Sequence, residues 1–282
     1  MSRFRTICIL AILIFVFPVA RAGTLVQFRT TFGDIEVELY DQDKPVTVQN
    51  FLRYVQSGRY TNEFSHRLVP GFVLQGGGFS LTTNTINTIP TFAPITNEIS
   101  VGTFYSNVYG TIAMAKTSDP NSATSQFFFN LTNNAASLDS TNNSGGFTVF
   151  GHVIAGTNIL NLFNKFQNWT SNPAPSPTNL VLDNYYSPPL DTLPVLSSNF
   201  PPTSASFVFM DISLLQIAIT NQNGSEQISW NSATGLTNIV EFTTNLPPVW
   251  STLITTNGTG ARMTVTDTAV APRRFYRVRV IY

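Results

Sequence analysis

A single arginine stands in an apolar stretch of a chain that has few charges. The stretch FSHRLVPGFVLQGGGF, residues 64–79, holds only His66 and Arg67 as ionisable residues, and just 11% of the whole chain is charged. A guanidinium presents its N–H donors in a planar fork and stays charged at any physiological pH. Beside an apolar pocket, such a group could stabilise a lone pair or charge that develops during a reaction.

Most other kinds of active-site chemistry lack the residues that they need. The one cysteine, Cys8, lies in the first 22 residues, so the rest of the chain can form no disulfide and no thiolate metal site. The two histidines, His66 and His152, are too few for a histidine-rich metal centre. The glycine run 76–78 is not followed by the Gly-Lys-Ser/Thr of a phosphate-binding loop. We therefore expect no metal and no cofactor.

The charge balance also bears on partners. Fifteen lysines and arginines match fifteen aspartates and glutamates, which leaves a formal net charge of zero. Nucleic-acid-binding proteins normally show a basic excess, so we expect no nucleic-acid partner. A hydrophobic content of 43% is typical of a folded protein with a sizeable core.

The elements that must hold Arg67 are mostly short strands. LVQFRT and DIEVELY alternate apolar and polar residues on either side of residues 31–33, which predicts an opening β-hairpin. The run SFVFMDISLL, residues 206–215, predicts a last strand that returns to pair near the N-terminal strand. Three further β-rich runs are GTIAMA (110–115), QFFFNL (126–131) and FTVFGHVI (147–154).

Two helices are expected among these strands. The first has Pro45 near its start and Gly58 just past its end, and the second covers NILNLFNKF with Thr157 as its N-cap. Residues 168–205 are rich in proline, serine and asparagine and predict loop and extended coil rather than packed elements. The pattern favours a mainly β fold, a closed or nearly closed barrel with helices covering its ends.

The first 22 residues resemble an export signal. Arg3 and Arg5 precede the apolar run ICILAILIFVF, and Ala20-Arg21-Ala22 fits the small-x-small rule for cleavage. A membrane anchor is the alternative, but the apolar run of roughly 11–14 residues is short against the about 20 that span a bilayer. We therefore expect a mature chain that starts near Gly23, has no membrane span, and is periplasmic, secreted or on the cell surface.

The C-terminal part, residues 216–282, has a different pattern. Five β-rich runs follow one another at roughly ten-residue spacing, which predicts a small β-sandwich-like domain. It contains no histidine or cysteine and few carboxylates, so no acid–base or nucleophilic constellation is available in it. Binding, surface attachment and sorting all remain open as its role.

Four sequence blocks, in this order, resemble the cyclophilins, which are peptidyl-prolyl cis–trans isomerases. The blocks are FSHRLVPGFVLQGGGF, GTIAMAKTSDPNSATSQFFFNL, SLD and FTVFGHV. The resemblance covers residues 24–215, is closest to bacterial exported members, and defines a domain at 23–215. It implies a closed eight-stranded β-barrel capped by two helices, in agreement with the pattern of strands.

The resemblance also implies roles for individual residues. Arg67 corresponds to the catalytic arginine. His66 corresponds to a histidine beside it and is counted among the substrate-binding residues, with a structural role as the alternative. The residues that correspond to the substrate pocket are Phe72, Gln75, Met114, Ala115, Gln126, Phe128, Leu138 and Phe147. Ser137 stands where many members carry the tryptophan associated with cyclosporin binding, and Lys116 replaces a frequent asparagine or arginine near the substrate backbone.

The chemistry of prolyl isomerisation suits these residue types. Rotation about an X–Pro bond crosses a barrier of roughly 18–20 kcal/mol because amide resonance resists twisting, yet no covalent bond breaks. An apolar pocket can hold the proline ring, while Arg67 donates a hydrogen bond to the twisted prolyl nitrogen or holds the neighbouring carbonyl. Gln75 and Gln126 would fix the peptide backbone. Because side chains alternate along a strand, Phe128 should face the pocket and its two neighbours the other side.

The expected partners are proline-containing polypeptides, and the expected role is in the folding of exported proteins. Two other functions stay open on the sequence. The barrel could bind proline segments without turnover, or the C-terminal domain could make the chain a secreted or cell-surface interaction protein. Retention of Arg67, Phe72 and Gln75 together favours catalysis, because binding alone would not require the arginine.

Overall fold

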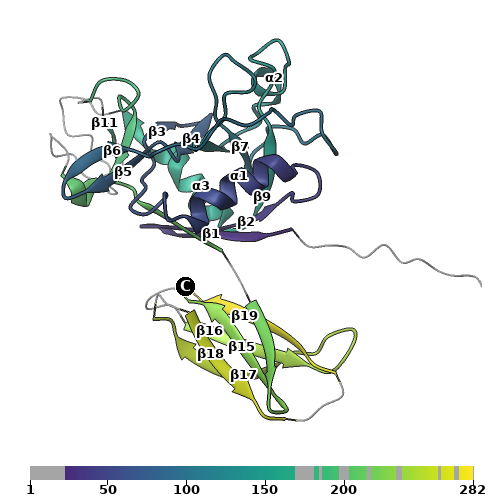
Figure 1. Ribbon diagram of the computed structural model, residues 1–282. Coiled ribbons are helices and arrows are strands. Elements are labelled where there is room, and N and C mark those ends of the chain that lie inside the picture. Colours follow the sequence, from purple (N-terminus) through teal and green to yellow (C-terminus); the bar gives the residue numbers. More distant parts are fainter. Residues whose placement is uncertain are drawn as a thin grey trace, which may run out of the picture.

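The fold was analysed in a computed structural model of the chain, shown in Figure 1. The structure describes residues 23–168, 181–183, 186–196, 203–214, 217–232, 237–259, 262–269 and 273–281. The expected export signal, residues 1–22, lies outside them. Within these ranges, none of the helices has the length and apolar character needed to cross a membrane.

Eight antiparallel strands form one sheet that surrounds the main core (Figure 1). The order across the sheet is β13-β1-β2-β9-β7-β8-β4-β3. The strands are β1 (Leu25–Thr30), β2 (Gly33–Leu39), β3 (Arg67–Val69), β4 (Val73–Gly76), β7 (Thr111–Met114), β8 (Phe127–Asn130), β9 (Val149–Ala155) and β13 (Met210–Leu214). The last strand pairs with the first, which confirms the predicted return to the N-terminal hairpin.

The two ends of this sheet meet. Phe64, three residues before β3, forms an isolated bridge with Phe209, directly before β13. The amide of Ser65 donates to the Val208 carbonyl at 2.9 Å, and the amide of Met210 donates to the Glu63 carbonyl at 3.0 Å. Backbone pairing therefore continues around the barrel, and the closed eight-stranded architecture is confirmed.

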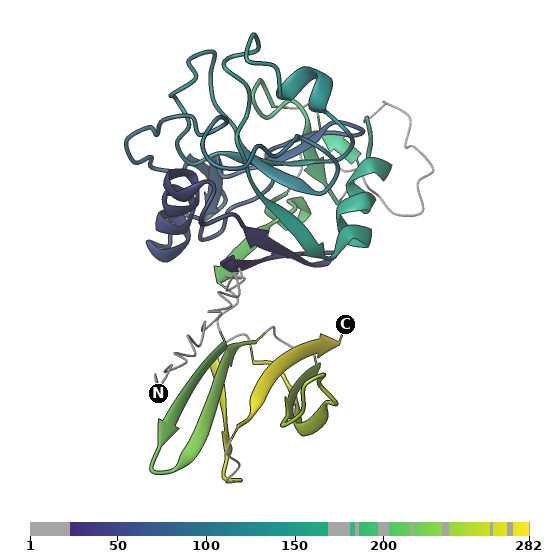
Figure 2. The same cartoon turned by 90° about the vertical axis from the view of Figure 1, so that its right-hand side faces the viewer.

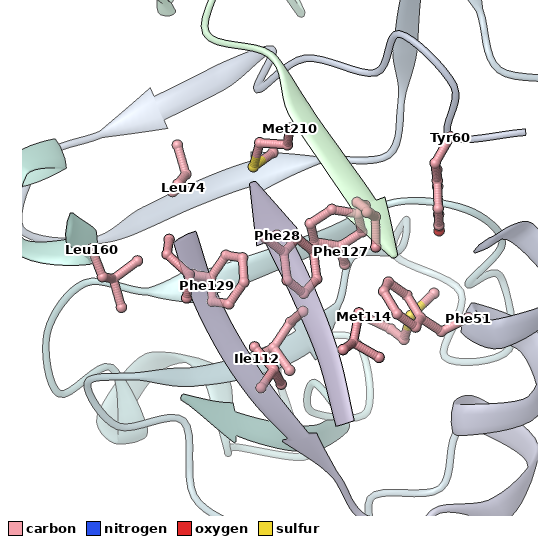
Figure 3. Close-up of a cluster of buried hydrophobic side chains, with 14 of the residues drawn as sticks. Phe28, Phe51, Tyr60, Leu74, Ile112, Met114, Phe127, Phe129, Leu160 and Met210 are labelled. Atoms are coloured by element: carbon pink, nitrogen blue, oxygen red, sulfur yellow. The ribbon is translucent and has the colours of Figure 1, made fainter. Parts of the chain in front are cut away.

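The interior of the barrel combines aromatic rings with aliphatic side chains (Figure 3). Phe28 on β1 lies edge-on to Phe127 and Phe129 of β8, with ring centroids 5.4 and 5.0 Å apart. All three side chains are completely buried. Burial of a side chain of this size stabilises the fold by roughly 1.5–3 kcal/mol relative to exposure, so these rings fix how β8 lies against the N-terminal hairpin.

The longest helix, α1 (Pro45–Gln56), packs its apolar face on this core. Pro45 occupies the first turn, where its missing N–H leaves no acceptor unsatisfied. Gly58, just past the end, has φ +70°, a conformation that suits glycine. Phe51 places its ring 5.6 Å from that of Phe127, so the predicted helix and its inward face are both confirmed.

The second predicted helix is shorter than expected and begins differently. It comprises α3 (Thr157–Leu162) followed by a 3-10 turn, η1 (Phe163–Lys165). The N-cap is Gly156, with φ +83°, and not Thr157 as the sequence predicted. A side chain at Gly156 would place its Cβ 2.2 Å from the Asp34 carbonyl oxygen, so the close approach to β2 selects glycine at the cap.

Part of the proline-rich segment is folded, contrary to the prediction of loop for residues 168–205. The strands β10 (Gln167–Asn168), β11 (Val181–Asp183) and β12 (Leu193–Val195) form a small sheet. Val181, Leu193 and Val195 are buried in a second apolar cluster together with Phe64 and Phe207. The prediction failed because the apolar runs VLD and LPV are only three residues long and stand among strong turn formers.

A hairpin, β5 (Phe79–Thr82) and β6 (Thr85–Thr88), also contributes to this second cluster.

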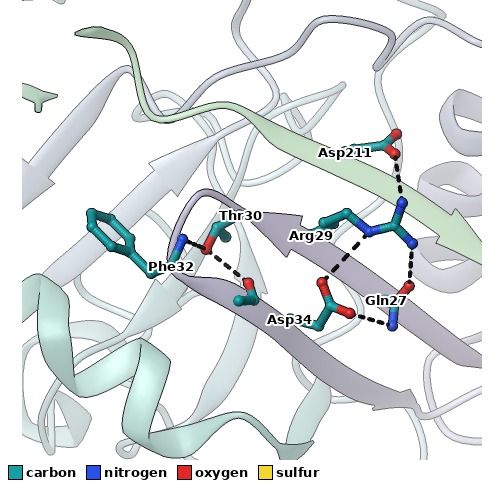
Figure 4. A network of polar contacts seen from close by, with 7 residues as sticks. Gln27, Arg29, Thr30, Phe32, Asp34 and Asp211 are labelled. Atoms are coloured by element: carbon teal, nitrogen blue, oxygen red, sulfur yellow. Dashed lines mark hydrogen bonds and ion pairs between the residues drawn. The ribbon is translucent and has the colours of Figure 1, made fainter. Parts of the chain in front are cut away.

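A polar network joins β13, the last strand of the barrel, to the hairpin formed by β1 and β2 (Figure 4). Arg29 lies between Asp34, at 3.6 Å, and Asp211 of β13, at 3.9 Å. The side-chain amide of Gln27 donates to the other carboxylate oxygen of Asp34 at 2.9 Å. This network therefore links β1, β2 and β13 through their side chains.

The C-terminal residues form two further antiparallel sheets, of order β14-β15-β18 and β17-β16-β19 (Figure 2). The strands are β14 (Ile217–Gln222), β15 (Ser225–Asn231), β16 (Thr237–Thr243), β17 (Ser251–Asn257), β18 (Arg262–Asp267) and β19 (Phe275–Ile281). The five predicted runs are all strands, and β14 is an addition. Ile228, Trp230 and Val240 are their buried core, as expected when two sheets share a face.

Candidate active site

A row of directly paired residues runs across four strands of the barrel. Arg67 on β3 pairs with Gln75 on β4, Gln75 pairs with Phe128 on β8, and Phe128 pairs with Ala113 on β7. Residues that face each other in antiparallel pairs project from the same side of a sheet. The guanidinium, the amide and the aromatic ring therefore share one face.

That shared face is the outer one. The neighbouring row consists of Leu68, Leu74, Phe129 and Ile112, and all four are completely buried in the barrel core. Since side chains alternate along a strand, the row that contains Arg67 points away from that core. Phe128 belongs to a separate apolar cluster, whereas Phe127 and Phe129 belong to the main core, as the alternation predicted.

This separate apolar cluster forms the walls of the candidate site. Phe128 and Phe147 meet edge to face, with ring centroids 5.9 Å apart and an angle of 71° between planes. Leu138, the last residue of the short helix α2 (Ala135–Leu138), is buried against them, while Phe147 is half-buried. The cluster comprises Val73, Ala113, Phe128, Leu138 and Val149, with Tyr40, Phe72, Tyr105, Ala115 and Phe147 packed against it.

Phe72 reaches this cluster because of the turn that precedes β4. Pro70 and Gly71 stand at the two central positions, and Gly71 has φ +71°, which is the pairing that a type II turn prefers. The Phe72 amide donates back to the Val69 carbonyl at 2.9 Å. The sequence VPGF thus places an aromatic side chain at the tip of the hairpin that carries Arg67 and Gln75.

Buried asparagines fix α2 to this turn. Asn134 donates to the Phe72 carbonyl and to the side-chain oxygen of Asn130, each at 2.8 Å. The amide of Leu131 also donates to the Phe72 carbonyl, at 2.9 Å. Sequence reasoning missed these asparagines and α2 itself, because a four-residue helix leaves no periodicity to read. Their contacts hold Leu138 over the apolar wall.

A line of polar contacts borders the apolar cluster. The Arg67 Nη1 donates to the Oε1 of Gln75 at 3.4 Å, and the Gln75 Nε2 donates to the Oε1 of Gln126 at 2.7 Å. The backbone carbonyl of Gln126 accepts a hydrogen bond from the backbone amide of Ala115 at 2.9 Å. None of the ion pairs found in the described part of the chain includes Arg67. The guanidinium charge is therefore oriented by amides and not neutralised by a carboxylate.

Met114 does not join the other predicted site residues, and its assignment to the pocket requires correction. It pairs with Phe127, so it lies in the inward row, and it is only 2% exposed in the barrel core. Figure 3 shows Met114 among the core side chains near Phe51. Ala113 and Ala115, on either side of it in sequence, belong to the outer cluster.

The predicted contact of His66 with substrate also requires correction. Its side chain is 1% exposed and lies against Phe79, with ring centroids 5.1 Å apart. Burial lowers the pKa of His66 to about 4, so the imidazole is neutral at physiological pH. The side chain supports the loop behind Arg67, which matches the structural alternative. Adjacent residues of an extended segment point to opposite sides, so one of His66 and Arg67 must face inward. The sequence alone does not say which of the two it is.

Lys116 lies at the rim of the apolar cluster, beside Phe147. Its Nζ lies 4.1 Å from the centre of the Phe147 ring and donates to the Ser144 carbonyl. A cation over a ring face is held by the ring quadrupole, so Lys116 fixes the orientation of Phe147. Burial lowers the pKa of the Lys116 ammonium. The sequence marked this position only as a departure from the usual residue.

Comparison with known proteins identifies the family. The model of the family described as "Cyclophilin type peptidyl-prolyl cis-trans isomerase/CLD" matches residues 25–182, more than half of the chain. The chain belongs to this family. Cyclophilins are peptidyl-prolyl cis-trans isomerases, and the match includes every residue of the row that contains Arg67. Residues 183–282 lie beyond the match.

Two bacterial relatives agree with this assignment. A peptidyl-prolyl cis-trans isomerase of Acinetobacter baylyi is 44% identical over 141 residues, which cover 50% of this chain and 72% of the relative. Isomerase A of Dickeya dadantii is 43% identical over 55% of this chain and 78% of its own length. A solved cyclophilin of Cryptosporidium parvum, determined in the presence of the dipeptide Ala-Pro, aligns with 22% identity and a TM-score of 0.44 over 68% of this chain and 99% of its own.

Proposed function

We propose that this cyclophilin accelerates X–Pro rotation by hydrogen bonding from Arg67 to a prolyl amide held against the apolar cluster. One observation carries the proposal. The strand pairings put Arg67, Gln75 and Phe128 in a single row on the outer face of the barrel. A positive donor and an apolar wall are therefore adjacent on a rigid sheet, which is the arrangement that a twisted amide requires.

The two halves of the site act on different parts of the substrate. The rings of Phe128 and Phe147 and the side chain of Leu138 offer a surface for the proline ring, without a charge to pair. As the C–N bond twists, resonance is lost and the prolyl nitrogen gains a lone pair that can accept a hydrogen bond. Arg67 can donate to this lone pair. Because the planar ground state offers no such acceptor, the bond stabilises the transition state selectively.

The hydrogen bond from Arg67 to the prolyl nitrogen should accelerate isomerisation by a modest factor that an exchange assay can measure. A hydrogen bond to a charged group contributes about 1.5–3 kcal/mol net. This free energy corresponds to roughly ten- to a hundredfold in rate. The neighbouring apolar walls reduce screening of the guanidinium and favour the upper part of this range.

Gln75 is assigned a role in orienting Arg67. Its carbonyl oxygen accepts from the guanidinium and its amino group donates to Gln126, so both ends of its side chain are engaged within the protein. Contact with the peptide backbone falls more naturally to Gln126. Both glutamines therefore contribute through geometry, not through proton transfer.

The proposed substrates are proline-containing polypeptides, and the proposed setting is the folding of exported proteins. The support for export is the basic start, the apolar run and Ala20-Arg21-Ala22 in the first 22 residues. Slow X–Pro isomerisation, on the order of tens of seconds or longer, limits the folding of many chains. An isomerase at the site of folding would remove this delay.

The test is exchange NMR on a short Ala-Pro peptide, which measures cis–trans interconversion directly. The wild-type protein should accelerate exchange, and Arg67→Ala should lose at least tenfold in kcat/KM while its peptide affinity changes little. Arg67→Lys should recover only part of the loss, because an ammonium lacks the planar fork. Equal rates for wild type and Arg67→Ala, with peptide still bound, would leave the non-catalytic binding function instead.

A further inference from the structure

A carboxylic acid is buried directly behind the active-site strands. Glu63 is 0% exposed, and it lies four residues before Arg67. Its backbone carbonyl accepts from Met210 and its backbone bridges to Ser80, so it sits where β13, β5 and the start of β3 converge. The proposed function makes no use of this group.

The side chain of Glu63 holds the glycine turn that follows Gln75. Its Oε1 accepts a hydrogen bond from the Gly77 amide at 2.6 Å. A Cβ on Gly76 would lie 2.4 Å from that same oxygen, so a larger residue there would have to displace the Glu63 carboxyl group. The run of three glycines thus lets the backbone wrap closely around a carboxyl group.

The same turn also supports the polar line of the active site. Gly77, with φ +76°, approaches the Ser125 carbonyl so closely that a Cβ would lie 2.4 Å from its oxygen. A Cβ on Gly78 would meet the ring of His66 at 2.8 Å and the side chain of Gln126 at 3.2 Å. Movement of the turn would therefore displace Gln126 directly, and Gln75 through the strand that joins it to Gly76.

The surroundings of Glu63 favour its neutral form. Its Oε2 is buried without a hydrogen-bond partner, and no cation pairs with it among the described residues. Gly77, Ser80 and Met210, which contact its side chain or backbone, cannot ionise in the physiological range. Burial raises the pKa of Glu63 to about 8, although the hydrogen bond from Gly77 opposes this shift.

Two other titratable groups lie on the same segment, and neither changes charge near neutral pH. Tyr60, which faces Glu63, is itself buried, and burial raises its pKa well above 10. Burial lowers the pKa of His66 to about 4. Of Tyr60, Glu63 and His66, Glu63 is therefore the group that ionises between pH 6 and 9.5. The resulting negative charge would be stabilised by a single N–H donor, the Gly77 amide.

We propose that Glu63 is a positioning residue for prolyl isomerisation. Its protonated carboxyl holds the turn of residues 76–78, which in turn holds Gln75 and Gln126 in line with Arg67. Ionisation of Glu63 draws water or counterions into this seam and displaces the turn, so turnover falls as the solution becomes alkaline. This inference rests on the proposed function, since it needs a turnover to modulate.

The decisive experiment follows kcat and KM by exchange NMR on an Ala-Pro peptide from pH 6 to 9.5. For wild type, we expect kcat to fall by about tenfold or more between pH 7 and 9.5, with a smaller change in KM. Glu63→Gln keeps an acceptor for the Gly77 amide but cannot ionise, so it should retain activity at pH 7 and lose the alkaline decline. Glu36→Gln, which removes a half-buried carboxyl on β2, is the matched control and should keep the decline.

A second measurement does not depend on a variant. The carbon-13 signal of the Glu63 carboxyl in the wild-type protein should titrate far above pH 4.5, and the side-chain amide signals of Gln75 and Gln126 should shift with the same midpoint. The inference would be overturned if the Glu63 carboxyl titrated near pH 4.5, or if the amide signals of Gln75 and Gln126 did not shift as Glu63 titrates. An alkaline decline that persists in Glu63→Gln, which would point to Lys116, would also overturn it. Absence of wild-type turnover at pH 7 would be a different failure, that of the proposed function.

Discussion

Replacing Gln75 by leucine would separate the orientation of Arg67 from its chemistry. The change keeps a side chain of similar size but removes the acceptor for the guanidinium, 3.4 Å away, and the donor to Gln126, 2.7 Å away. Arg67 would keep its charge and its backbone position on β3. It would then sample several rotamers, of which only a fraction can reach a prolyl nitrogen.

The expected loss follows from the geometry of the two bonds. The contact with Arg67 is long and half-exposed, so we place it at or just below the lower limit of the range for charged hydrogen bonds, at about 1–1.5 kcal/mol. We expect Gln75→Leu to lower kcat by about five- to tenfold and to change KM little. Gln56→Leu, at the exposed end of α1, is the matched control and should leave both constants unchanged.

A double-mutant cycle provides the stringent test. If Gln75 acts through Arg67, the variant that combines Arg67→Ala with Gln75→Leu should be no slower than Arg67→Ala alone. Peptide exchange NMR on the four proteins, at equal temperature and pH, gives the coupling directly. Fully additive losses would refute the reasoning, because they would mean that Gln75 contacts the substrate independently of Arg67.

Three further predictions concern stability, inhibition and the C-terminal sheets. Because burial raises the pKa of Glu63 from 4.5 to about 8, the stabilisation from its neutral form is complete below pH 4.5 and is lost as pH rises to 8. Urea unfolding should show that wild type loses about 5 kcal/mol relative to Glu63→Gln over this interval, and parallel curves would contradict it. Ser137 is exposed on α2, so cyclosporin should inhibit weakly and Ser137→Trp should strengthen inhibition in a titration; tight inhibition of the wild type would oppose this. Truncation after Leu215 should leave turnover on the Ala-Pro peptide unchanged, and a loss of turnover would show that the C-terminal residues support the site.

The alternation of strands made part of the site predictable. In the run QFFFNL, a period of two separates Phe128 from Phe127 and Phe129, and the structure places them on opposite faces of β8. Likewise, Pro45 and Gly58 marked the ends of α1 because their backbone restrictions are local. Such signals survive in the sequence because each depends on near neighbours only.

Met114 shows where this reasoning stops. The alternation along GTIAMA says that Met114 and Ala115 face opposite sides, but not which of them faces outward. The pairing of Met114 with Phe127 across β7 and β8 decides that, and it turns Met114 into the core. Residue type was misleading too, because a methionine suits an apolar pocket and a barrel interior equally well.

The sequence by itself determined the family, the mainly β architecture and the presence of an arginine within an apolar stretch. Only the tertiary structure decided which side chains meet. Register across β3, β4, β8 and β7 aligned Arg67, Gln75 and Phe128, and closure of the barrel buried Glu63 against the turn that follows Gln75. The reason is physical: local propensity depends on neighbours in the chain, whereas facing direction and burial depend on partners that lie far away in it.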